Sequence, residues 1–329
     1  MSDHKVTSLE ELSDLCTPWC IHVVGTLRIA DHIAAGIDDI ADLAKAAGCD
    51  YFALRVVLSH LVNKRVFDEI QPGRIALNEV SQGLLDPTRR PDLHGIGGRM
   101  AYAWGTLPTF VQTGQSGYAD MFGLPFWEDL EAHPEIAESF DALMGPAGHG
   151  TPDPNFPVTG GWENVKTVVD VGGGTGAMLA EILRNRPEIR GTLVDLPKTV
   201  ARSNEIFQKA GVANRVTVSG QNFFDPLPAG ADLYLLKKVL NNWSDREKVL
   251  ILRRCAEAAH PASRIVILGG ISPDETPHEL AIDLVMLGGR VSPLSEFRQL
   301  ALEANLEISA AEMQASGGYV VECKPIQSG

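Results

Sequence analysis

The chain has 329 residues, 44% hydrophobic and 21% charged, which is the composition of a globular protein long enough for two domains. Its formal net charge of −14 argues against a nucleic-acid or anionic-membrane partner, because binding phosphate groups needs a basic surface. The start MSDHKVTSLEELSD is polar and acidic, unlike a signal peptide, and no apolar run of roughly 18 residues follows it. We therefore expect a cytoplasmic protein with no membrane or nucleic-acid partner.

The cysteines are an odd number and widely scattered. Two of them lie four residues apart and can share one face of a helix, but the sequence offers no His or Cys pair at matching spacing to complete a metal site. We therefore expect reduced core thiols and no metal. The five are Cys16, Cys20, Cys49, Cys255 and Cys323.

The first 95 residues are predicted to form a winged helix. Residues 11–36 carry apolar residues at helical spacing and end on Gly36, and residues 37–70 give two short helices split near Gly48. Residues 66–79 alternate around a Pro-Gly turn, which indicates a hairpin. Three helices and a hairpin in this order make a winged helix.

A winged helix often binds DNA. The third helix, residues 50–67, therefore decides between a DNA-binding domain and a dimerisation domain. It is mostly apolar and offers only Arg55, Lys64 and Arg65 to phosphates. Such a helix suits packing against a second subunit better than entry into a DNA groove. We expect a homodimer, with a DNA-binding regulator as the alternative.

The second domain is predicted to span residues 96–329. Residues 96–160 are a helical linker region punctuated by Pro and Gly, and residues 161–329 alternate strands and helices. The chain ends in two strands around Gly317-Gly318, a terminal hairpin. This pattern predicts an α/β, doubly wound, Rossmann-like sheet with an antiparallel edge. The expected parallel strands are residues 165–171, 191–196, 215–220, 232–240 and 264–270.

The strongest chemical signal is VVDVGGGTGA, residues 168–177, where a strand runs into glycines and then a helix. Gly172, Gly174 and Ala177 also satisfy the dinucleotide pattern G-x-G-x-x-G/A, so the glycines alone leave NAD open. Asp170 suits a cationic ligand, and Asp195, closing the next strand, can bind both hydroxyls of a ribose. With the terminal hairpin, these carboxylates favour S-adenosylmethionine (SAM); a structural turn without ligand is the third possibility.

At this point the sequence resembles the small-molecule, caffeic-acid and polyketide type SAM-dependent O-methyltransferases. The resemblance covers nearly the whole chain and is closest to the bacterial branch of the anthracycline enzymes (carminomycin 4-O-methyltransferase, aclacinomycin 10-hydroxylase) and the naphthoic-acid methyltransferases. It implies a class I methyltransferase sheet and an N-terminal winged-helix dimerisation domain. It rests on the motifs FWEDL, SFDALM, VVDVGGGTG, LVDLP, NFFDPLPAG, VLNNWSD, ILRRCAEA and DLVMLGGR, in that order.

The resemblance also implies a SAM site. The glycine loop would hold the methionine end, the carboxylate of the second strand the ribose, and the GQNFF segment the adenine. A lysine would lie near the carboxylate or sulfonium end, and two residues of SFDALM would cover the cofactor and the acceptor; the alternative is that these two are core residues. In this sequence these positions are Asp170, Gly172, Gly173, Gly174, Asp195, Asn222, Phe223, Lys237, Phe140 and Met144.

The acid–base residues of the family are absent. Where the plant-type enzymes read V-L-H-D-W, this chain has Asn241 and Asn242, and the expected glutamate is Gly269. We expect Asn242, with Asn241, to orient the acceptor without titrating; the alternative is an asparagine that caps the turn. His149 is the leading candidate for another base, and His22 and His32 could reach across a dimer. Expected acceptor contacts are Asn242, Trp243, Trp104 and Met286.

Losing the base does not exclude methyl transfer. A positioned base contributes about 3–5 kcal/mol, whereas proximity and orientation can contribute about 7–11 kcal/mol. We therefore predict a SAM-dependent methyltransferase that acts on a hydroxyl of an aromatic or polyketide-like small molecule by proximity and orientation. Two alternatives stay open: a SAM-binding relative that hydroxylates, decarboxylates or rearranges its substrate, and a SAM-sensing winged-helix regulator.

Overall fold

The computed structural model describes residues 8–87, 90–144, 152–277 and 280–327. The chain divides into two compact units, the first containing residues 1–102 with 135–139 and the second residues 103–134 with 140–329. The predicted domain division at residue 95 stays a prediction. Within the described ranges, no helix is long and apolar enough to cross a bilayer.

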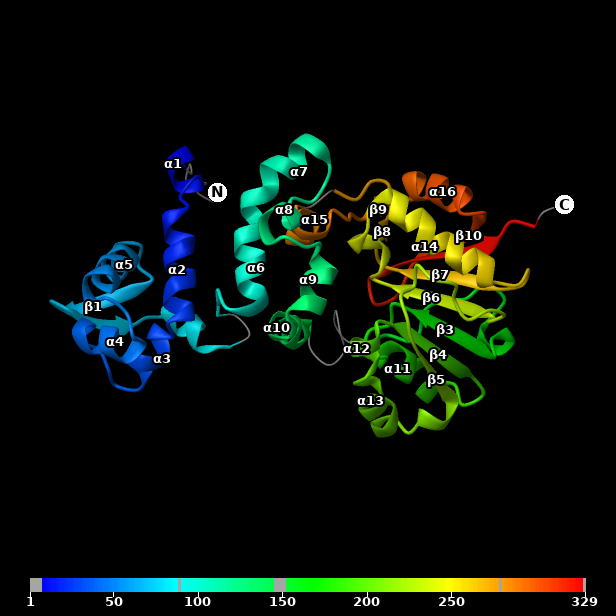
Figure 1. The fold of residues 1–329 in the computed structure, drawn as a ribbon, viewed down its shortest axis with the longest axis horizontal. Coiled ribbons are helices and arrows are strands. Elements are labelled where there is room, and N and C mark those ends of the chain that lie inside the picture. The colour runs from blue at the N-terminus through cyan, green and yellow to red at the C-terminus, as the bar shows by residue number, and fades with distance from the viewer. Residues whose placement is uncertain (1–7, 88–89, 145–151, 278–279, 328–329) are drawn as a thin grey trace, which may run out of the picture. The chain divides into compact units, whose positions relative to one another are not determined.

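The first unit contains short helices followed by a hairpin (Figure 1). The segment predicted as helical before Gly36 is not one helix, because Arg28 adopts a left-handed φ of 54° between α2 and α3. Gly48 ends α4 with a φ of 66°, and the hairpin turns at Pro72-Gly73, both as predicted. The elements are α1 (Leu9–Leu12), α2 (Cys16–Thr26), α3 (Ile29–Ala34), α4 (Ile40–Ala47), α5 (Tyr51–Asn63), β1 (Phe67–Gln71) and β2 (Arg74–Leu77).

Helix α5 has two apolar faces. Leu54, Leu58 and Leu61 are buried in the core of the first unit. Phe52 and Val56, on the other side of the helix, are 71% and 54% exposed. This outward face of α5 is therefore apolar, and no described residue of this unit covers it.

The second unit is built on a seven-stranded sheet of order β10-β11-β7-β6-β3-β4-β5. The strands from β7 to β5 run parallel, and β11 and β10 add an antiparallel hairpin at one edge. This confirms the predicted Rossmann-like sheet and its terminal hairpin. The strands are β3 (Thr167–Val171), β4 (Arg190–Asp195), β5 (Val216–Gly220), β6 (Leu233–Lys237), β7 (Arg264–Leu268), β10 (Leu306–Met313) and β11 (Tyr319–Pro325).

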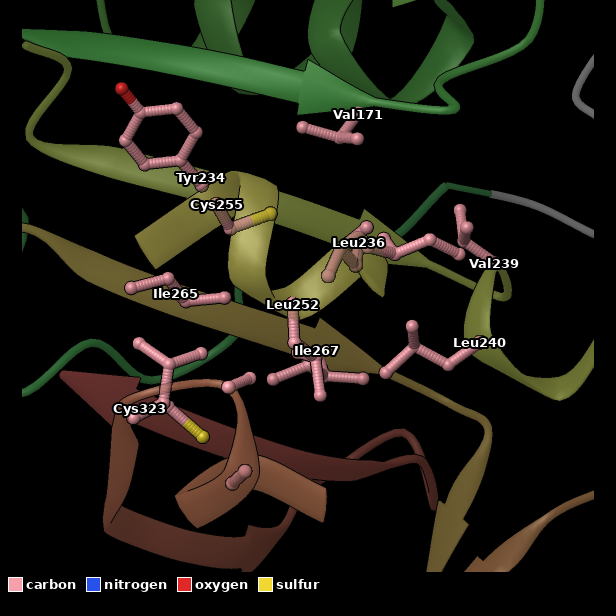
Figure 2. Packing of buried hydrophobic residues seen from close by; sticks show 14 of the residues in the cluster. Val171, Tyr234, Leu236, Val239, Leu240, Leu252, Cys255, Ile265, Ile267 and Cys323 are labelled. Atoms are coloured by element: carbon pink, nitrogen blue, oxygen red, sulfur yellow. The ribbon is translucent and has the colours of Figure 1, made fainter. Parts of the chain in front are cut away.

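Helices cover both faces of this sheet (Figure 1). On one face α14 (Asp245–Ala258) and α16 (Leu294–Glu303) bury their apolar sides, and Figure 2 shows this layer, with the thiols of Cys255 and Cys323 inside it. The other face packs on α11 (Ala177–Asn185), α12 (Pro197–Val200) and α13 (Ser203–Lys209). The prediction of core thiols is right for Cys255 and Cys323 and wrong for Cys16, which is exposed.

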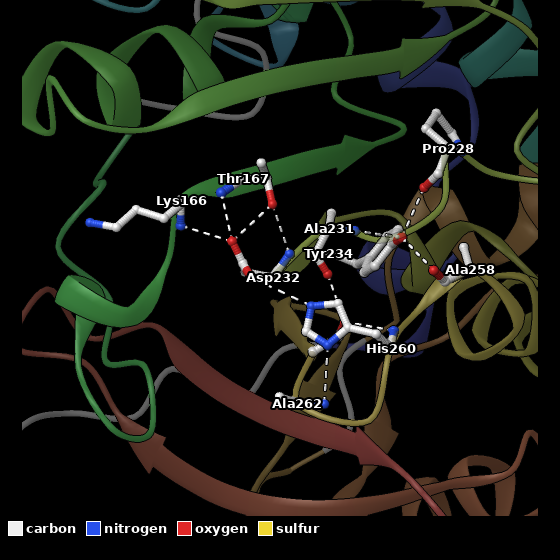
Figure 3. A network of polar contacts seen from close by, with 10 residues as sticks. Lys166, Thr167, Pro228, Ala231, Asp232, Tyr234, Ala258, His260 and Ala262 are labelled. Atoms are coloured by element: carbon white, nitrogen blue, oxygen red, sulfur yellow. Dashed lines mark hydrogen bonds and ion pairs between the residues drawn. The ribbon is translucent and has the colours of Figure 1, made fainter.

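At the amino ends of the strands, Asp232 ties neighbouring strands together (Figure 3). Its Oδ2 accepts hydrogen bonds from the backbone N–H of Lys166 and from the N–H and hydroxyl of Thr167, each at 2.9 Å. His260 Nε2 lies 3.4 Å from its Oδ1. These bonds fix the starts of β3 and β6 relative to each other. The carboxyl ends of the two strands therefore lie side by side at the opposite edge of the sheet.

The remaining elements of the chain lie before the sheet or in its connections. They are η1 (Ser81–Leu85), α6 (Gly95–Ala103), η2 (Trp104–Thr106), α7 (Leu107–Thr113), α8 (Tyr118–Phe122), α9 (Phe126–Ala132), α10 (Pro134–Met144), η3 (Trp162–Asn164), η4 (Ala213–Arg215), η5 (Leu240–Asn242), β8 (Ile271–Ser272), α15 (Ile282–Leu287) and β9 (Ser292–Pro293).

Candidate functional site

The loops after β3, β4, β6 and β7 meet at the carboxyl edge of the sheet, where open α/β sheets bind their ligands. A Cβ at Gly172 would lie 2.8 Å from Val239 Cγ2 and 3.4 Å from Phe223 Cε1. A Cβ at Gly269 would lie 3.3 Å from Lys238 Cγ. The glycine loop, the GQNFF segment and the asparagine turn therefore lie side by side.

The glycine loop needs glycine for two different reasons. Gly172 and Gly174 have φ values of 67° and 62°, a region that residues with a Cβ rarely adopt. At Gly173 the obstacle is space, because a Cβ would lie 2.5 Å from Asp170 Oδ2. The loop leads directly into α11, so its backbone can approach a ligand at the start of that helix.

Asp170 is a fully buried carboxylate with unmet hydrogen-bonding capacity. Neither of its oxygens has a well-formed hydrogen bond among the described residues, and the nearby backbone of Leu179 only weakly favours its ionised form. Burial raises the pKa of this carboxyl from 3.8 to about 7, although the ammonium of Lys237 acts in the opposite direction. A buried, unpaired carboxylate is costly, and a cationic ligand would relieve that cost.

Asp195 is held at the end of β4 by two backbone groups. The N–H of Gly174 donates to Oδ2 at 2.8 Å, and the N–H of Leu196 donates to Oδ1 at 2.8 Å. The bond to Gly174 joins the ends of β3 and β4. The carboxylate is therefore fixed beside the glycine loop, where the predicted ribose contact requires it.

The GQNFF segment is only partly arranged as predicted. Phe223 is half-buried beside Gly172, as the predicted adenine contact requires, and its ring centroid lies 5.8 Å from that of Trp243. Asn222 is exposed, and its Oδ1 accepts a hydrogen bond from the N–H of Phe224 at 3.0 Å. Asn222 thus closes its own turn, and its role towards adenine stays a prediction.

Two lysines follow each other where β6 ends. Lys237 is half-buried; burial lowers its pKa, and the carboxylate of Asp170 raises it. Lys238 has a left-handed φ of 53°, and its N–H donates to the carbonyl of Leu268 at 2.8 Å. The chain therefore bends sharply at Lys238, and this bend starts the asparagine turn.

The two asparagines form a short chain of amide groups. Asn241 Nδ2 donates to Asn242 Oδ1 at 2.9 Å, and Asn242 Nδ2 donates to the carbonyl oxygen of Lys238 at 3.3 Å. Asn241 Oδ1 is buried and has no hydrogen-bond partner among the described residues. The acceptor atom without any donor among the described residues therefore belongs to Asn241, whereas the oxygen of Asn242 already accepts one hydrogen bond.

The direction of this amide chain is fixed by its last member. A backbone carbonyl only accepts hydrogen bonds, so Asn242 must present its NH2 group to Lys238. Its oxygen then faces Asn241, which must present its own NH2 group in turn. Reversing either amide would place two acceptors against each other, so Asn241 has to direct its oxygen away from Asn242.

Glycines form the wall opposite the asparagine turn. A Cβ at Gly270 would lie 3.1 Å from the backbone N of Asn241 and 3.6 Å from its Oδ1, and a Cβ at Gly289 would overlap the backbone of Asn241 and Asn242. Gly269, where the family has glutamate, has a φ of 78°. Amide groups and glycines therefore lie next to each other at this turn.

Helix α15 carries one predicted acceptor contact and packs on the elements of two others, η2 and η5. Met286 is buried, and its carbonyl and that of Val285 accept hydrogen bonds from Ser116 Oγ at 2.7 and 2.8 Å. Trp104, on η2, is 41% exposed. The structure thus brings the elements of Met286, Trp104 and Asn242 together, and their contacts with an acceptor stay predictions.

The other predicted residues are placed only in part. Phe140 packs edge-on against the rings of Phe126 and Trp127, at centroid distances of 5.5 and 5.9 Å. His149 and the side chain of Met144 lie outside the described residues. His22 and His32 lie on α2 and α3 of the first unit, so their predicted reach across a dimer stays a prediction.

Lys248 is a structural residue of the site that the sequence analysis missed. Its fully buried ammonium donates to Asp245 Oδ1, to the carbonyl of Arg290 and to Ser292 Oγ, at 3.1, 2.9 and 2.8 Å. These bonds hold the segment that contains Gly289 against the asparagine turn. The available signal was a lysine at an inward position of α14, which amphipathic spacing alone treats as exposed.

The chemistry of the donor set fits SAM. The unpaired carboxylate of Asp170 suits a cation, Asp195 is positioned for ribose hydroxyls, and the loop at Gly172 keeps backbone close to the start of a helix. Fold and site together define a class I methyltransferase.

Comparison with known proteins gives the family. The model of the O-methyltransferase domain family matches residues 104–306. The chain is 37% identical to the 2,7-dihydroxy-5-methyl-1-naphthoate 7-O-methyltransferase of Streptomyces carzinostaticus, covering 92% of this chain and 93% of that protein. It is also 37% identical to the aclacinomycin 10-hydroxylase RdmB of Streptomyces purpurascens, covering 94% and 86%.

A solved structure agrees along the whole chain. It is an O-methyltransferase from neocarzinostatin biosynthesis in complex with S-adenosyl-L-homocysteine and 1,4-dihydroxy-2-naphthoic acid, with a TM-score of 0.84, 33% identity and coverage of 98% and 100%. The chain therefore belongs to the O-methyltransferase family, as its motifs predict. It is a SAM-dependent methyltransferase, and the prediction of this cofactor over NAD is confirmed.

Proposed function

We propose that the protein transfers a methyl group to an acidic hydroxyl of a fused-ring aromatic compound, and that Asn241 orients this hydroxyl. The observation that carries the proposal is the buried oxygen of Asn241, to which no described part of the chain donates a hydrogen bond. A protonated hydroxyl is the donor that fits it. Asn241 stands where the family has its histidine, so it can receive the same hydrogen bond without accepting the proton.

The missing base limits the acceptor. A phenol with a pKa of about 10 costs about 4 kcal/mol to ionise at pH 7, and an amide cannot reduce that cost by taking the proton. A carbonyl or a second hydroxyl on the same ring system lowers the pKa of the phenol itself. Hydroxylated naphthoates and anthraquinones have this property, and the naphthoate enzyme quoted above acts on such a ring.

The residues of this chain have separate tasks in the reaction. When bound, SAM supplies an electrophilic methyl group on a sulfonium. Asp195 and the glycine loop would hold the nucleoside and methionine ends, while Asn241 holds the hydroxyl of the acceptor. As the oxygen–methyl bond forms and the carbon–sulfur bond breaks, the hydroxyl proton passes to water. Orientation can contribute about 7–11 kcal/mol to such a reaction.

The test is a mass-spectrometric assay with methyl-deuterated SAM and a panel of hydroxynaphthoates and hydroxyanthraquinones of graded hydroxyl pKa. We expect one labelled methyl ether for each S-adenosylhomocysteine formed, with faster turnover of the more acidic hydroxyls. A rate that does not depend on the hydroxyl pKa would contradict orientation without a base. Unlabelled methyl ether would contradict the methyl transfer itself.

A second candidate function is hydroxylation of a similar ring without methyl transfer, with molecular oxygen as the oxidant and an external thiol as the two-electron reductant. The chain is as similar in sequence to aclacinomycin 10-hydroxylase as to the naphthoate methyltransferase, at 37% identity each, which favours this candidate. The same assay, run in air with the thiol present, separates the two. A product with one added oxygen, no label and no loss of SAM would establish the second function and exclude the first.

We also propose a homodimer formed through the first unit. Support comes from the outward face of α5, where Tyr51, Phe52 and Val56 are 45%, 71% and 54% exposed. Phe52→Glu should convert the dimer to a monomer in sedimentation equilibrium. Leu250→Glu, at a site 40% exposed on the second unit, is the matched control and should leave the mass unchanged. A monomeric wild-type chain would contradict the proposal.

A further inference from the structure

Outside the methyl-transfer site, three side chains of the first unit converge from two helices. Cys16 and Cys20 lie on α2 and His60 lies on α5. The two sulfurs are 3.9 Å apart, and these sulfurs and a ring nitrogen of His60 all lie within 4.8 Å of one another. Nothing in the methyl-transfer chemistry uses this cluster.

We propose that Cys16, Cys20 and His60 form a binding site for a zinc ion. The residues are those that zinc prefers in proteins, two thiolates and one imidazole. Hard cations such as calcium and magnesium bind oxygen ligands instead, so the donor set selects a thiophilic metal.

The spacing of the sulfurs suits a shared metal better than a disulfide. Two sulfurs bound tetrahedrally at about 2.3 Å from one zinc ion lie about 3.8 Å apart, close to the 3.9 Å between Cys16 and Cys20. A disulfide would need about 2.05 Å. The cluster therefore needs little movement to coordinate zinc.

A chain of hydrogen bonds already orients the imidazole. Thr17 Oγ1 lies 2.8 Å from His60 Nε2 and donates to Asp14 Oδ2 at 2.6 Å, and Asp14 Oδ2 pairs with Lys64 Nζ at 2.8 Å. Since the hydroxyl proton goes to Asp14, Thr17 accepts from Nε2–H, and the lone pair of the neutral ring lies on Nδ1. Metal-binding histidines commonly have such outer support, which sets ring orientation and tautomer.

The coordination would use three protein ligands and leave one position open. Cys16 is exposed and Cys20 and His60 are half-buried, so an ion can enter from solvent and keep a water as fourth ligand. Because the ligands come from two helices, zinc would join α2 to α5 and raise the thermal stability of the chain. This effect is independent of SAM and of the acceptor.

The test uses the full-length, reduced chain after chelator treatment and titrates it with cobalt(II), a spectroscopic substitute for zinc. We expect one equivalent to bind with a thiolate-to-cobalt charge-transfer band, and zinc to displace it. Cys16→Ser, Cys20→Ser and His60→Gln should each weaken binding at least 100-fold. Thr17→Val should weaken it about 10–100-fold by removing the outer support.

Matched controls distinguish this site from general metal binding. Cys49→Ser changes a half-buried thiol of the same unit, and His22→Gln changes a histidine of the same helix, and both should bind as the wild type does. Zinc should raise the Tm of the wild type but not of Cys16→Ser, whose exposed position keeps the fold intact. Absence of the charge-transfer band in the wild type, or its persistence in Cys16→Ser and Cys20→Ser, would overturn the proposal.

Discussion

The two halves of the methyl-transfer site differ in charge. At the ends of β3 and β4 lie the carboxylates Asp170 and Asp195, and Lys237 ends the neighbouring strand. The turn after β6 and the segment after β7 present amides and glycines, and the family's histidine and glutamate are replaced by Asn241 and Gly269. Carboxylates therefore lie where the cationic cofactor is predicted to bind, whereas uncharged amides lie where the acceptor is proposed to bind. Cofactor binding and acceptor chemistry should therefore respond to different variants.

The largest effect should come from Asp195→Ala. It removes a carboxylate that Gly174 and Leu196 hold in place, and with it the proposed hydrogen bonds to the ribose. Hydrogen bonds to charged groups are worth about 1.5–3 kcal/mol each, so the Kd for SAM should rise on the order of 100-fold in calorimetry. Asp225→Ala, at an exposed position of the next loop, is the control and should bind normally. An unchanged Kd in Asp195→Ala would place the ribose elsewhere.

Lys248→Met should weaken acceptor binding at the asparagine turn without changing SAM binding at Asp170 and Asp195. It deprives Asp245, Ser292 and the carbonyl of Arg290 of a donor, so we expect the free energy of unfolding in urea to fall by about 2 kcal/mol. The KM for the acceptor should rise because Gly289 loses its support, whereas the Kd for SAM should stay constant. Lys209→Met, at an exposed lysine, controls for loss of charge. Equal losses in both affinities would show that the halves are not separate.

Asn241→Ala and Asn242→Ala distinguish which of the two asparagines holds the acceptor. If the oxygen of Asn241 accepts the hydroxyl, its loss removes one hydrogen bond of about 1–1.5 kcal/mol, and kcat/KM should fall about 10-fold with unchanged Kd for SAM. Asn242→Ala should have a smaller effect, because it releases Asn241 without removing its oxygen. The reverse order would support the initial prediction that Asn242 holds the acceptor. A loss beyond about 10⁴-fold in either variant would indicate a chemical role.

The last expected effect is a pH dependence of SAM binding that should belong to the cofactor side, at Asp170, alone. The pKa of Asp170 is raised from 3.8 to about 7, chiefly by burial, so this carboxyl is protonated in the free enzyme at pH 5.5 and ionised above about pH 7. A cationic ligand prefers the ionised form, and SAM affinity should therefore rise with pH up to about 7 and then level off. The slope is at most tenfold per pH unit. Asp170→Asn should bind SAM more weakly and without this dependence; an unchanged slope would assign it to another group.

Much of the fold follows from local sequence patterns. The apolar runs before Gly172 and after Asp232, and the Gly317-Gly318 turn, predict strands and a hairpin that the structure confirms. The helical segment before Gly36 is the clearest error, because helical spacing continues through Arg28 while the backbone there turns left-handed. Spacing reports which side chains face the core, and it does not report the dihedral angle of a single residue.

The candidate site likewise has features that local sequence motifs predict and features that only tertiary contacts create. The glycine loop and Asp195 are local motifs, so sequence places them correctly beside each other. The orientation of the Asn241 oxygen depends on the hydrogen bond that Asn242 Nδ2 donates to the carbonyl of Lys238, which no residue pattern encodes. Likewise, 43 residues separate Thr17 from His60, so the cluster around Cys16 arises only when α2 and α5 pack together.

The backbone at Gly269 limits what protein engineering could add to the site. At a φ of 78°, a glutamate there would be strained, and its Cβ would also crowd Lys238. A histidine can be introduced at position 241 by one substitution, but an orienting carboxylate cannot be added at position 269 without reshaping the end of β7. A designed general base would therefore need its orienting partner on another element.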